Sequence, residues 1–203
     1  TQIGLITLCF QLMASVLQPA VGLYTDKYPK PYLLPSGMVM TLLGLILLAL
    51  SSSFTMLLLA SALIGMGSST FHPEASRVAR LASGGRFGFA QSFFQVGGNA
   101  GSAFGPLLAA VIILPRGQTA IIWFSLFALL GIAVLSAVSR WTIRSGASLK
   151  AVKKQPHFSH LSSAQVKGAL LVLALLVFSK YIYMAAITNY YTFYLMEKFA
   201  VPV

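Results

Sequence analysis

Residues 87–114 read FGFAQSFFQVGGNAGSAFGPLLAAVIIL and contain no ionisable side chain. About 20 predominantly apolar residues are enough to cross the hydrocarbon core of a bilayer as an α-helix. Inside hydrocarbon the backbone must satisfy its own hydrogen bonds, which only helices and closed barrels achieve. A barrel strand would alternate apolar and polar residues over a short length, and residues 87–114 do not. They therefore predict a transmembrane helix.

The composition of the whole chain extends this prediction. Of the 203 residues, 57% are hydrophobic and 8% are charged, whereas a soluble domain carries about 25% charged residues. Too few charges remain to cover a water-facing surface, so lipid must cover much of the chain. With residues 87–114 we predict six spans in an all-α, polytopic transmembrane bundle, and the third is expected to stay helical through Arg80. The other five spans are residues 3–24, 33–51, 54–71, 120–138 and 168–196.

The placement of the charges predicts the orientation. The net charge is +11, from 14 Lys and Arg against 3 Asp and Glu. In a soluble protein this excess would suggest nucleic acid, but here the cations lie between the apolar spans. Eleven occupy the first, third and fifth connections, which the positive-inside rule places in the cytoplasm. They are Lys27, Lys30, Arg77, Arg80, Arg86, Arg140, Arg144, Lys150, Lys153, Lys154 and Lys167.

The same pattern predicts the domain organisation. Residues 1–138 form an N-terminal transmembrane bundle that lacks its first helix, because Thr1 would otherwise begin a helix outside the membrane. Residues 139–167 form a basic cytoplasmic linker, and residues 168–203 form the first helix of a C-terminal bundle. We expect the remainder of the same chain to be a partner of this fragment.

The first cytoplasmic connection, residues 22–30, reads GLYTDKYPK. A carboxylate beside a cation at a helix end either clamps a neighbouring helix terminus or belongs to an ordinary charged turn. The stretch resembles the signature loop of major facilitator transporters, although Pro29 and Pro31 depart from the family pattern. The resemblance implies that Asp26 helps to close the inward gate. The matching positions of this gating loop are Gly22, Asp26, Lys27 and Lys30.

A second resemblance lies in residues 101–110, GSAFGPLLAA. They are similar to the Gly-xxx-Gly-Pro motif of proton-coupled exporters in the same superfamily, with Gly101, Gly105 and Pro106 matching. Gly97, Gly101 and Gly105 recur every fourth residue and would let another helix approach closely. Pro106 removes a backbone donor and permits a bend.

A polar face accompanies these glycines. Gln91, Gln95 and Asn99 also recur every fourth residue, about 200° around the helix from the glycine face. Two interpretations fit this pattern: the amides line a cavity, or they bond neighbouring helices.

The ionisable residues inside or beside spans are candidate functional groups. Lys180 is predicted near mid-membrane, where a lysine is costly unless it faces water or a partner. We therefore predict that Lys180, followed by Tyr181, lines a transport cavity. For His72, Glu74 and Arg77 two interpretations stay open: a substrate or proton site, or an interfacial helix end with a local Glu–Arg pair.

Further runs narrow the resemblance. Residues 71–80, 82–86, 90–99 and 178–181 are similar to drug exporters of the major facilitator superfamily. This implies twelve helices in two halves in the bacterial cytoplasmic (inner) membrane, and proton-coupled efflux of a small anionic phosphonate drug. The implied partners are the substrate, protons and the lipid bilayer, without nucleic acid, cofactor or metal.

Two other functions remain as alternatives. An importer of a sugar or organic acid would share the architecture, although the Gly-Pro motif argues against it. A non-transporting membrane scaffold would explain the hydrophobicity but not the polar faces or Lys180. An enzyme is not expected, because the sequence shows no metal cluster or nucleophile–base pair.

Overall fold

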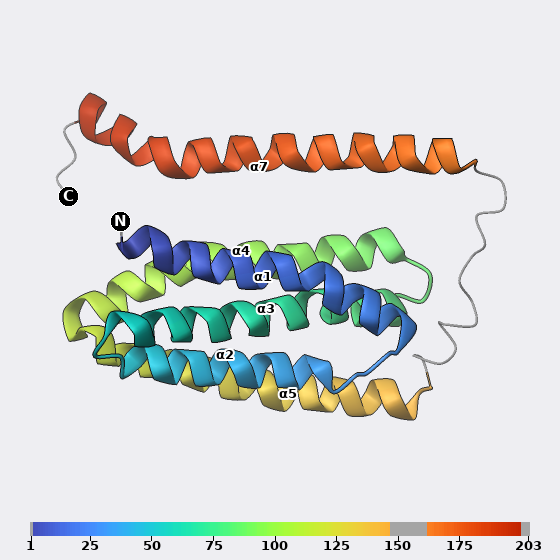
Figure 1. Cartoon of the computed structure of the whole chain (residues 1–203), viewed down its shortest axis with the longest axis horizontal. Coiled ribbons are helices and arrows are strands. Elements are labelled where there is room, and N and C mark those ends of the chain that lie inside the picture. Colours follow the sequence, from blue (N-terminus) through green and yellow to red (C-terminus); the bar gives the residue numbers. More distant parts are fainter. Residues whose placement is uncertain (1, 147–161, 200–203) are drawn as a thin grey trace. The chain divides into compact units, whose positions relative to one another are not determined.

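The computed structural model describes residues 2–146 and 162–199, and this part of the chain is helical with no strand. The all-α fold class is therefore confirmed. The elements in chain order (Figure 1) are α1 (Gln2–Lys27), α2 (Leu33–Ala49), α3 (Phe54–Ala82), α4 (Phe87–Arg116), the 3₁₀ helix η1 (Gln118–Trp123), α5 (Phe124–Arg144) and α7 (Ser163–Phe199).

Helices occur at all six predicted spans. Within the described residues, five stretches are long and apolar enough to cross a membrane: Gly4–Lys27, Phe54–Ala82, Phe87–Arg116, Gln118–Arg144 and Ser163–Met184. The helix of the second predicted span, α2, is apolar but has 17 residues, which is about 26 Å, slightly less than the hydrocarbon core. As predicted, α3 stays helical past Arg80. It is followed by a turn in which Gly84 and Gly85 adopt φ of 59° and 96°, a conformation that favours glycine.

The chain divides into two compact units, Thr1–Gln155 and Pro156–Val203. The first unit contains α1 to α5, and the second contains α7. Helix covers both ends of the predicted linker, because α5 continues to Arg144 and α7 begins at Ser163. Residues 147–161, with Lys150, Lys153 and Lys154, lie outside the described residues, so the linker stays a prediction.

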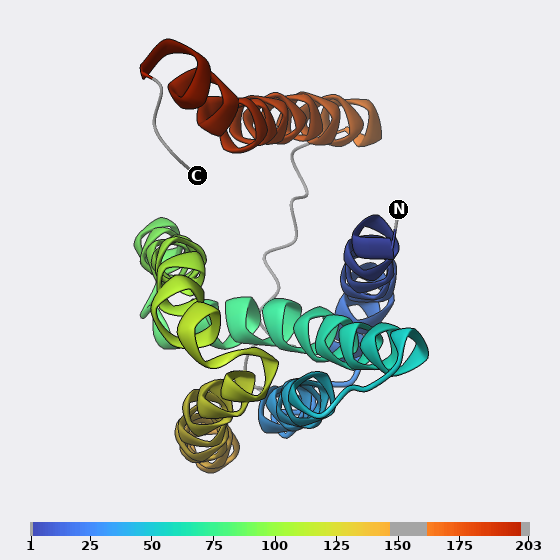
Figure 2. The ribbon, with the colours of Figure 1, turned by 90° about the vertical axis from the view of Figure 1, so that its left-hand side faces the viewer.

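Helix α3 is the centre of the first unit (Figure 2). It packs along α1 and α2 and touches α4, while α2 also packs against α5. Glycines on α3 make the two closest packings possible. A Cβ at Gly65 would lie 2.7 Å from the carbonyl oxygen of Phe10 on α1, and a Cβ at Gly67 would lie 2.5 Å from that of Gly37 on α2. No side chain fits at either position without moving a helix.

The helices of the first unit alternate in direction. Helices α1, α3 and α5 end where α2 and α4 begin (Figure 1), so the basic connections share one end, predicted to be cytoplasmic. At the opposite end, the Gln118 amide of η1 donates to the carbonyl oxygens of Leu48 at 2.8 Å and Ser51 at 3.0 Å. These bonds tie η1 to the end of α2. Helix α4 differs from its neighbours in having no buried residue.

Candidate functional site

A pocket of about 630 Å³ opens at the basic end of the first unit, between α1, α3 and α4. It brings together five residues of the predicted sites that are distant in sequence: Gly22, Asp26, His72, Arg77 and Gln91. The remaining lining residues are Gln18, Thr25, Pro73, Ser76, Arg80, Phe87 and Gly88. Ser76 and Arg80 were not predicted as site residues. His72, Ser76 and Arg80 follow each other at a spacing of four residues, which places them on one face of α3. This spacing is the feature of the sequence that could have indicated Ser76 and Arg80 as site residues.

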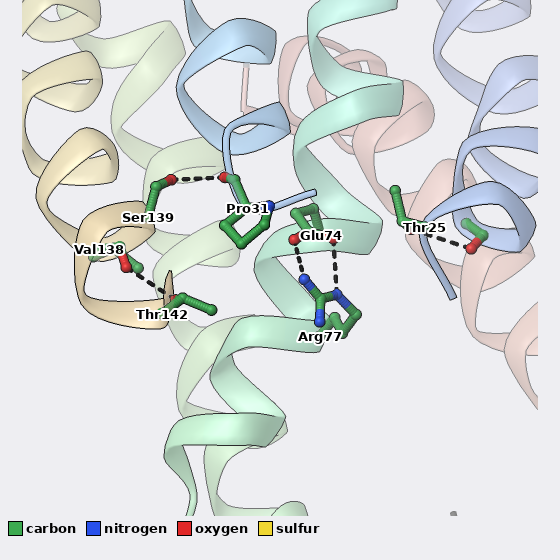
Figure 3. Close-up of polar contacts among 8 residues, drawn as sticks. Thr25, Pro31, Glu74, Arg77, Val138, Ser139 and Thr142 are labelled. Atoms are coloured by element: carbon green, nitrogen blue, oxygen red, sulfur yellow. Dashed lines mark hydrogen bonds and ion pairs between the residues drawn. The ribbon is translucent and has the colours of Figure 1, made fainter. Parts of the chain in front are cut away.

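A buried ion pair lies beside the pocket, and its arginine, Arg77, is one of the lining residues (Figure 3). The Glu74 carboxylate is fully buried, and the Arg77 side chain is 14% exposed. The Nε of Arg77 donates to Oε2 of Glu74 at 2.9 Å, and its Nη2 donates to Oε1. Two parallel bonds of this kind are among the strongest that a carboxylate makes. The local pair left open by the sequence is thus present, and it compensates the buried negative charge.

An amide bridge joins α4 to α3 beside the pocket. The Gln91 Nε2 donates to the carbonyl oxygen of Ser76 at 3.0 Å, and the Ser76 hydroxyl donates to Gln91 Oε1 at 3.0 Å. Gln91 therefore both lines the pocket and bonds a neighbouring helix. The next amide, Gln95, donates to Asn99 Oδ1 at 3.2 Å on the exposed surface of α4. A cavity role for Gln95 and Asn99 stays a prediction.

The gating loop contributes the acidic wall of the pocket. Asp26 lines it, and among the described residues no cation lies within 4.0 Å of the Asp26 carboxylate. The two cations of the loop lie over aromatic rings. Lys27 Nζ is 5.5 Å from the centre of the Tyr28 ring, and Lys30 Nζ is 5.9 Å from that of Tyr24. A gating role for Asp26 stays a prediction.

One buried hydroxyl group ties the chain just after this loop to α5, and a second makes a bond within α1 (Figure 3). The buried Ser139 hydroxyl on α5 donates to the carbonyl oxygen of Pro31 at 2.6 Å. The buried Thr25 hydroxyl donates to the carbonyl oxygen of Gly22, one turn earlier in α1, at 3.1 Å. Ser139 therefore anchors the loop to a helix more than a hundred residues away.

The Gly-xxx-Gly-Pro motif lies on an open part of α4. A Cβ added at Gly101 or at Gly105 would meet no heavy atom within 4 Å. Pro106 lies inside the helix, which runs without interruption from Phe87 to Arg116. Close approach of another helix to these glycines therefore stays a prediction.

Lys180 and Tyr181 lie near the middle of α7 and are described within that unit alone. Lys180 is 17 residues after Ser163, or about 26 Å along the helix. Its Nζ lies 5.8 Å from the centre of the Tyr181 ring. In the described part of the chain, no carboxylate lies within 4.0 Å of Lys180, and no group of three or more His, Cys, Asp or Glu residues is placed to hold a metal. The place of Lys180 and Tyr181 in a transport pathway stays a prediction.

Comparison with known proteins identifies the family of this chain. Residues 1–202 match the model of the Major Facilitator Superfamily. The chain therefore belongs to this superfamily of small-molecule transporters and is a multi-pass membrane protein. The family resemblance inferred from its motifs is confirmed.

Two curated relatives sharpen this result. Over 202 residues, the whole chain is 58% identical to one half of the "Fosmidomycin resistance protein" of Escherichia coli (strain K12). Over 206 residues, it is 41% identical to one half of the "Uncharacterized MFS-type transporter YfnC" of Bacillus subtilis (strain 168). The chain thus spans about half the length of the curated relatives it matches. No solved structure matches it.

Proposed function

We propose that the protein containing this chain exports a small anionic drug such as fosmidomycin across the bacterial cytoplasmic membrane in exchange for protons. The observation that carries the proposal is the 58% identity, over the whole chain, to a protein named for resistance to that phosphonate. The polar pocket at the predicted cytoplasmic end supports it, because an exporter must accept its substrate from that side.

The residues around the pocket suit an anionic substrate. Arg77 and Arg80 both line it, and a guanidinium presents paired donors that match phosphonate oxygens. Arg77 is already neutralised by Glu74, so Arg80 carries the available positive charge. His72 and Gln91 add donors beside it. In the proposed pathway Lys180 and Tyr181 continue the route through the membrane, where a bound anion would lower the cost of the lysine charge.

The buried pair suggests how protons enter the cycle. Exchange requires that the drug and the proton occupy the protein in alternate steps, because two ligands that favour each other's binding would be carried together. In the proposed cycle Glu74 is protonated from outside after the drug has left. Its proton would be lost inside before the next drug molecule binds.

The proposal is tested with the complete protein in everted membrane vesicles that hold a preformed acid-inside proton gradient. Added fosmidomycin should raise the lumenal pH in a dose-dependent manner, and vesicles without the protein should not respond. No response, with the protein present in the membrane, would overturn proton-coupled export of this drug. Drug-dependent proton flow in the opposite direction would indicate an importer.

A further inference from the structure

The cytoplasmic end of α5 carries two arginines on its outer face. Ser139 and Thr142 are fully buried against the rest of the unit, whereas Arg140 and Arg144 are exposed. At about 100° per residue, Arg140 and Arg144 each lie about 160° around the helix from Thr142. They therefore share a face that points away from the neighbouring helices of the first unit.

Within the described residues, these two arginines have no carboxylate partner. The chain contains three acidic residues, Asp26, Glu74 and Glu197, and among the described residues no carboxylate lies within 4.0 Å of Arg140 or Arg144. Arg140 uses its Nε to donate to the carbonyl oxygen of Ser136 in its own helix, at 3.3 Å. Two cations one helical turn apart attract an anion. The described residues supply none at this position.

The depth of the pair matches the phosphate layer of the membrane. Helix α5 has 21 residues, about 32 Å, which is close to the thickness of the hydrocarbon core. The end with Arg140 and Arg144 therefore reaches the headgroup level on the predicted cytoplasmic side. Trp141, between them, is 47% exposed, and tryptophan prefers this interfacial layer. Trp141 and Ala137 line the same surface hollow as the two arginines.

We propose that Arg140 and Arg144 bind the phosphate of an anionic phospholipid from the cytoplasmic leaflet. The two guanidinium groups would grip the phosphate oxygens with paired donors. The ring of Trp141 and the methyl group of Ala137 would contact the glycerol and upper acyl region, which free phosphate lacks. The site belongs to the membrane-facing surface of α5, so it is independent of drug export.

The test measures the binding of phosphatidylglycerol to the complete purified protein in neutral detergent by native mass spectrometry. An interfacial cation contributes about 1 kcal/mol of attraction, or about 5-fold in affinity. The paired change Arg140→Gln with Arg144→Gln should therefore weaken binding by about 25-fold. Arg140→Lys with Arg144→Lys keeps both charges and should retain most of the affinity. Arg116→Gln, which removes an exposed cation at the opposite end of the bundle, should leave it unchanged.

Three results would overturn the proposal. The first is that the paired glutamine variant binds the lipid as tightly as the parent, while an unchanged thermal unfolding midpoint in lipid-free detergent shows that it is folded. The second is that the combined changes Lys150→Gln, Lys153→Gln and Lys154→Gln abolish binding although both arginines are intact. The third is that glycerol phosphate competes at the same concentration as the lipid, which would make this a site for free phosphate. Because drug transport is not the readout, failure here is distinct from failure of the proposed export.

Discussion

Replacing Ser139 by Ala tests how the gating loop is held. The serine hydroxyl is fully buried and donates to the carbonyl oxygen of Pro31 at 2.6 Å. Leaving a buried acceptor without its partner costs about 1–3 kcal/mol. The carbonyl oxygen of Pro31 also accepts a longer bond from the backbone N–H of Leu34, at 3.3 Å, and this bond would remain. We therefore expect Ser139→Ala to lower the free energy of unfolding by about 1–1.5 kcal/mol.

Thr142→Val is the matched control. Thr142 is as deeply buried on the same helix, but its hydroxyl donates to the carbonyl oxygen of Val138 in α5 itself, at 2.9 Å. Such back-bonding slightly destabilises a helix, so valine, which has a similar volume, should leave stability nearly unchanged. Both variants would be compared by thermal unfolding of the complete purified protein.

A second readout separates loop position from general stability. With Cys9 replaced by Ala, Lys30→Cys places a thiol on the loop, and its reaction rate with a polar maleimide reports how the loop is held. Ser139→Ala should raise this rate, and Thr142→Val should not. Equal effects of the two changes on both stability and labelling would refute the anchoring role of Ser139.

Three further changes probe the ion pair, the helix packing and the pathway. Glu74→Gln should lower the free energy of unfolding by about 3 kcal/mol, which is the lower end for a broken buried pair, because the Arg77 side chain is still 14% exposed to water. If Glu74→Gln destabilised the protein no more than Arg80→Gln does, this prediction would be wrong. Gly67→Ala places a Cβ 2.5 Å from a carbonyl oxygen of α2 and should cost about 1–3 kcal/mol. A Cβ at Gly98 would meet no heavy atom within 4 Å, so Gly98→Ala should be tolerated. Similar unfolding midpoints for Gly67→Ala and Gly98→Ala would exclude tight packing at Gly67. Lys180→Met should abolish drug-dependent proton movement in vesicles while the protein is expressed normally, and unchanged transport would remove Lys180 from the pathway.

The spans were predictable because they depend on local properties. Long apolar runs, and glycines at positions such as Gly84 and Gly85, specify helices and turns without information about neighbours. The continuation of α3 past Arg80 followed from the same reasoning.

The contacts between different elements at the basic end were harder to predict. They depend on the rotation and depth of each helix, which packing at positions such as Gly65 and Gly67 determines. The bond from Ser139 to Pro31 and the bridge from Gln91 to Ser76 connect residues on different elements. No periodicity within one helix indicates such partners. The local pair of Glu74 and Arg77 was foreseeable as an alternative because both residues lie on one helical turn.

The distribution of buried polar groups suggests how the first unit would move. Thr25, Glu74, Ser139 and Thr142 are all buried near the basic end, and each is satisfied by a bond within the unit. Three of these bonds lie within one helix, and the bond from Ser139 to Pro31 joins α5 to the connection before α2. Separating α5 from that connection would leave a buried polar group without its partner, which is costly. Transporters of this kind work largely by rigid-body rocking of one bundle against another. A bundle whose buried polar groups at this end are paired internally can move in this way without breaking its own bonds.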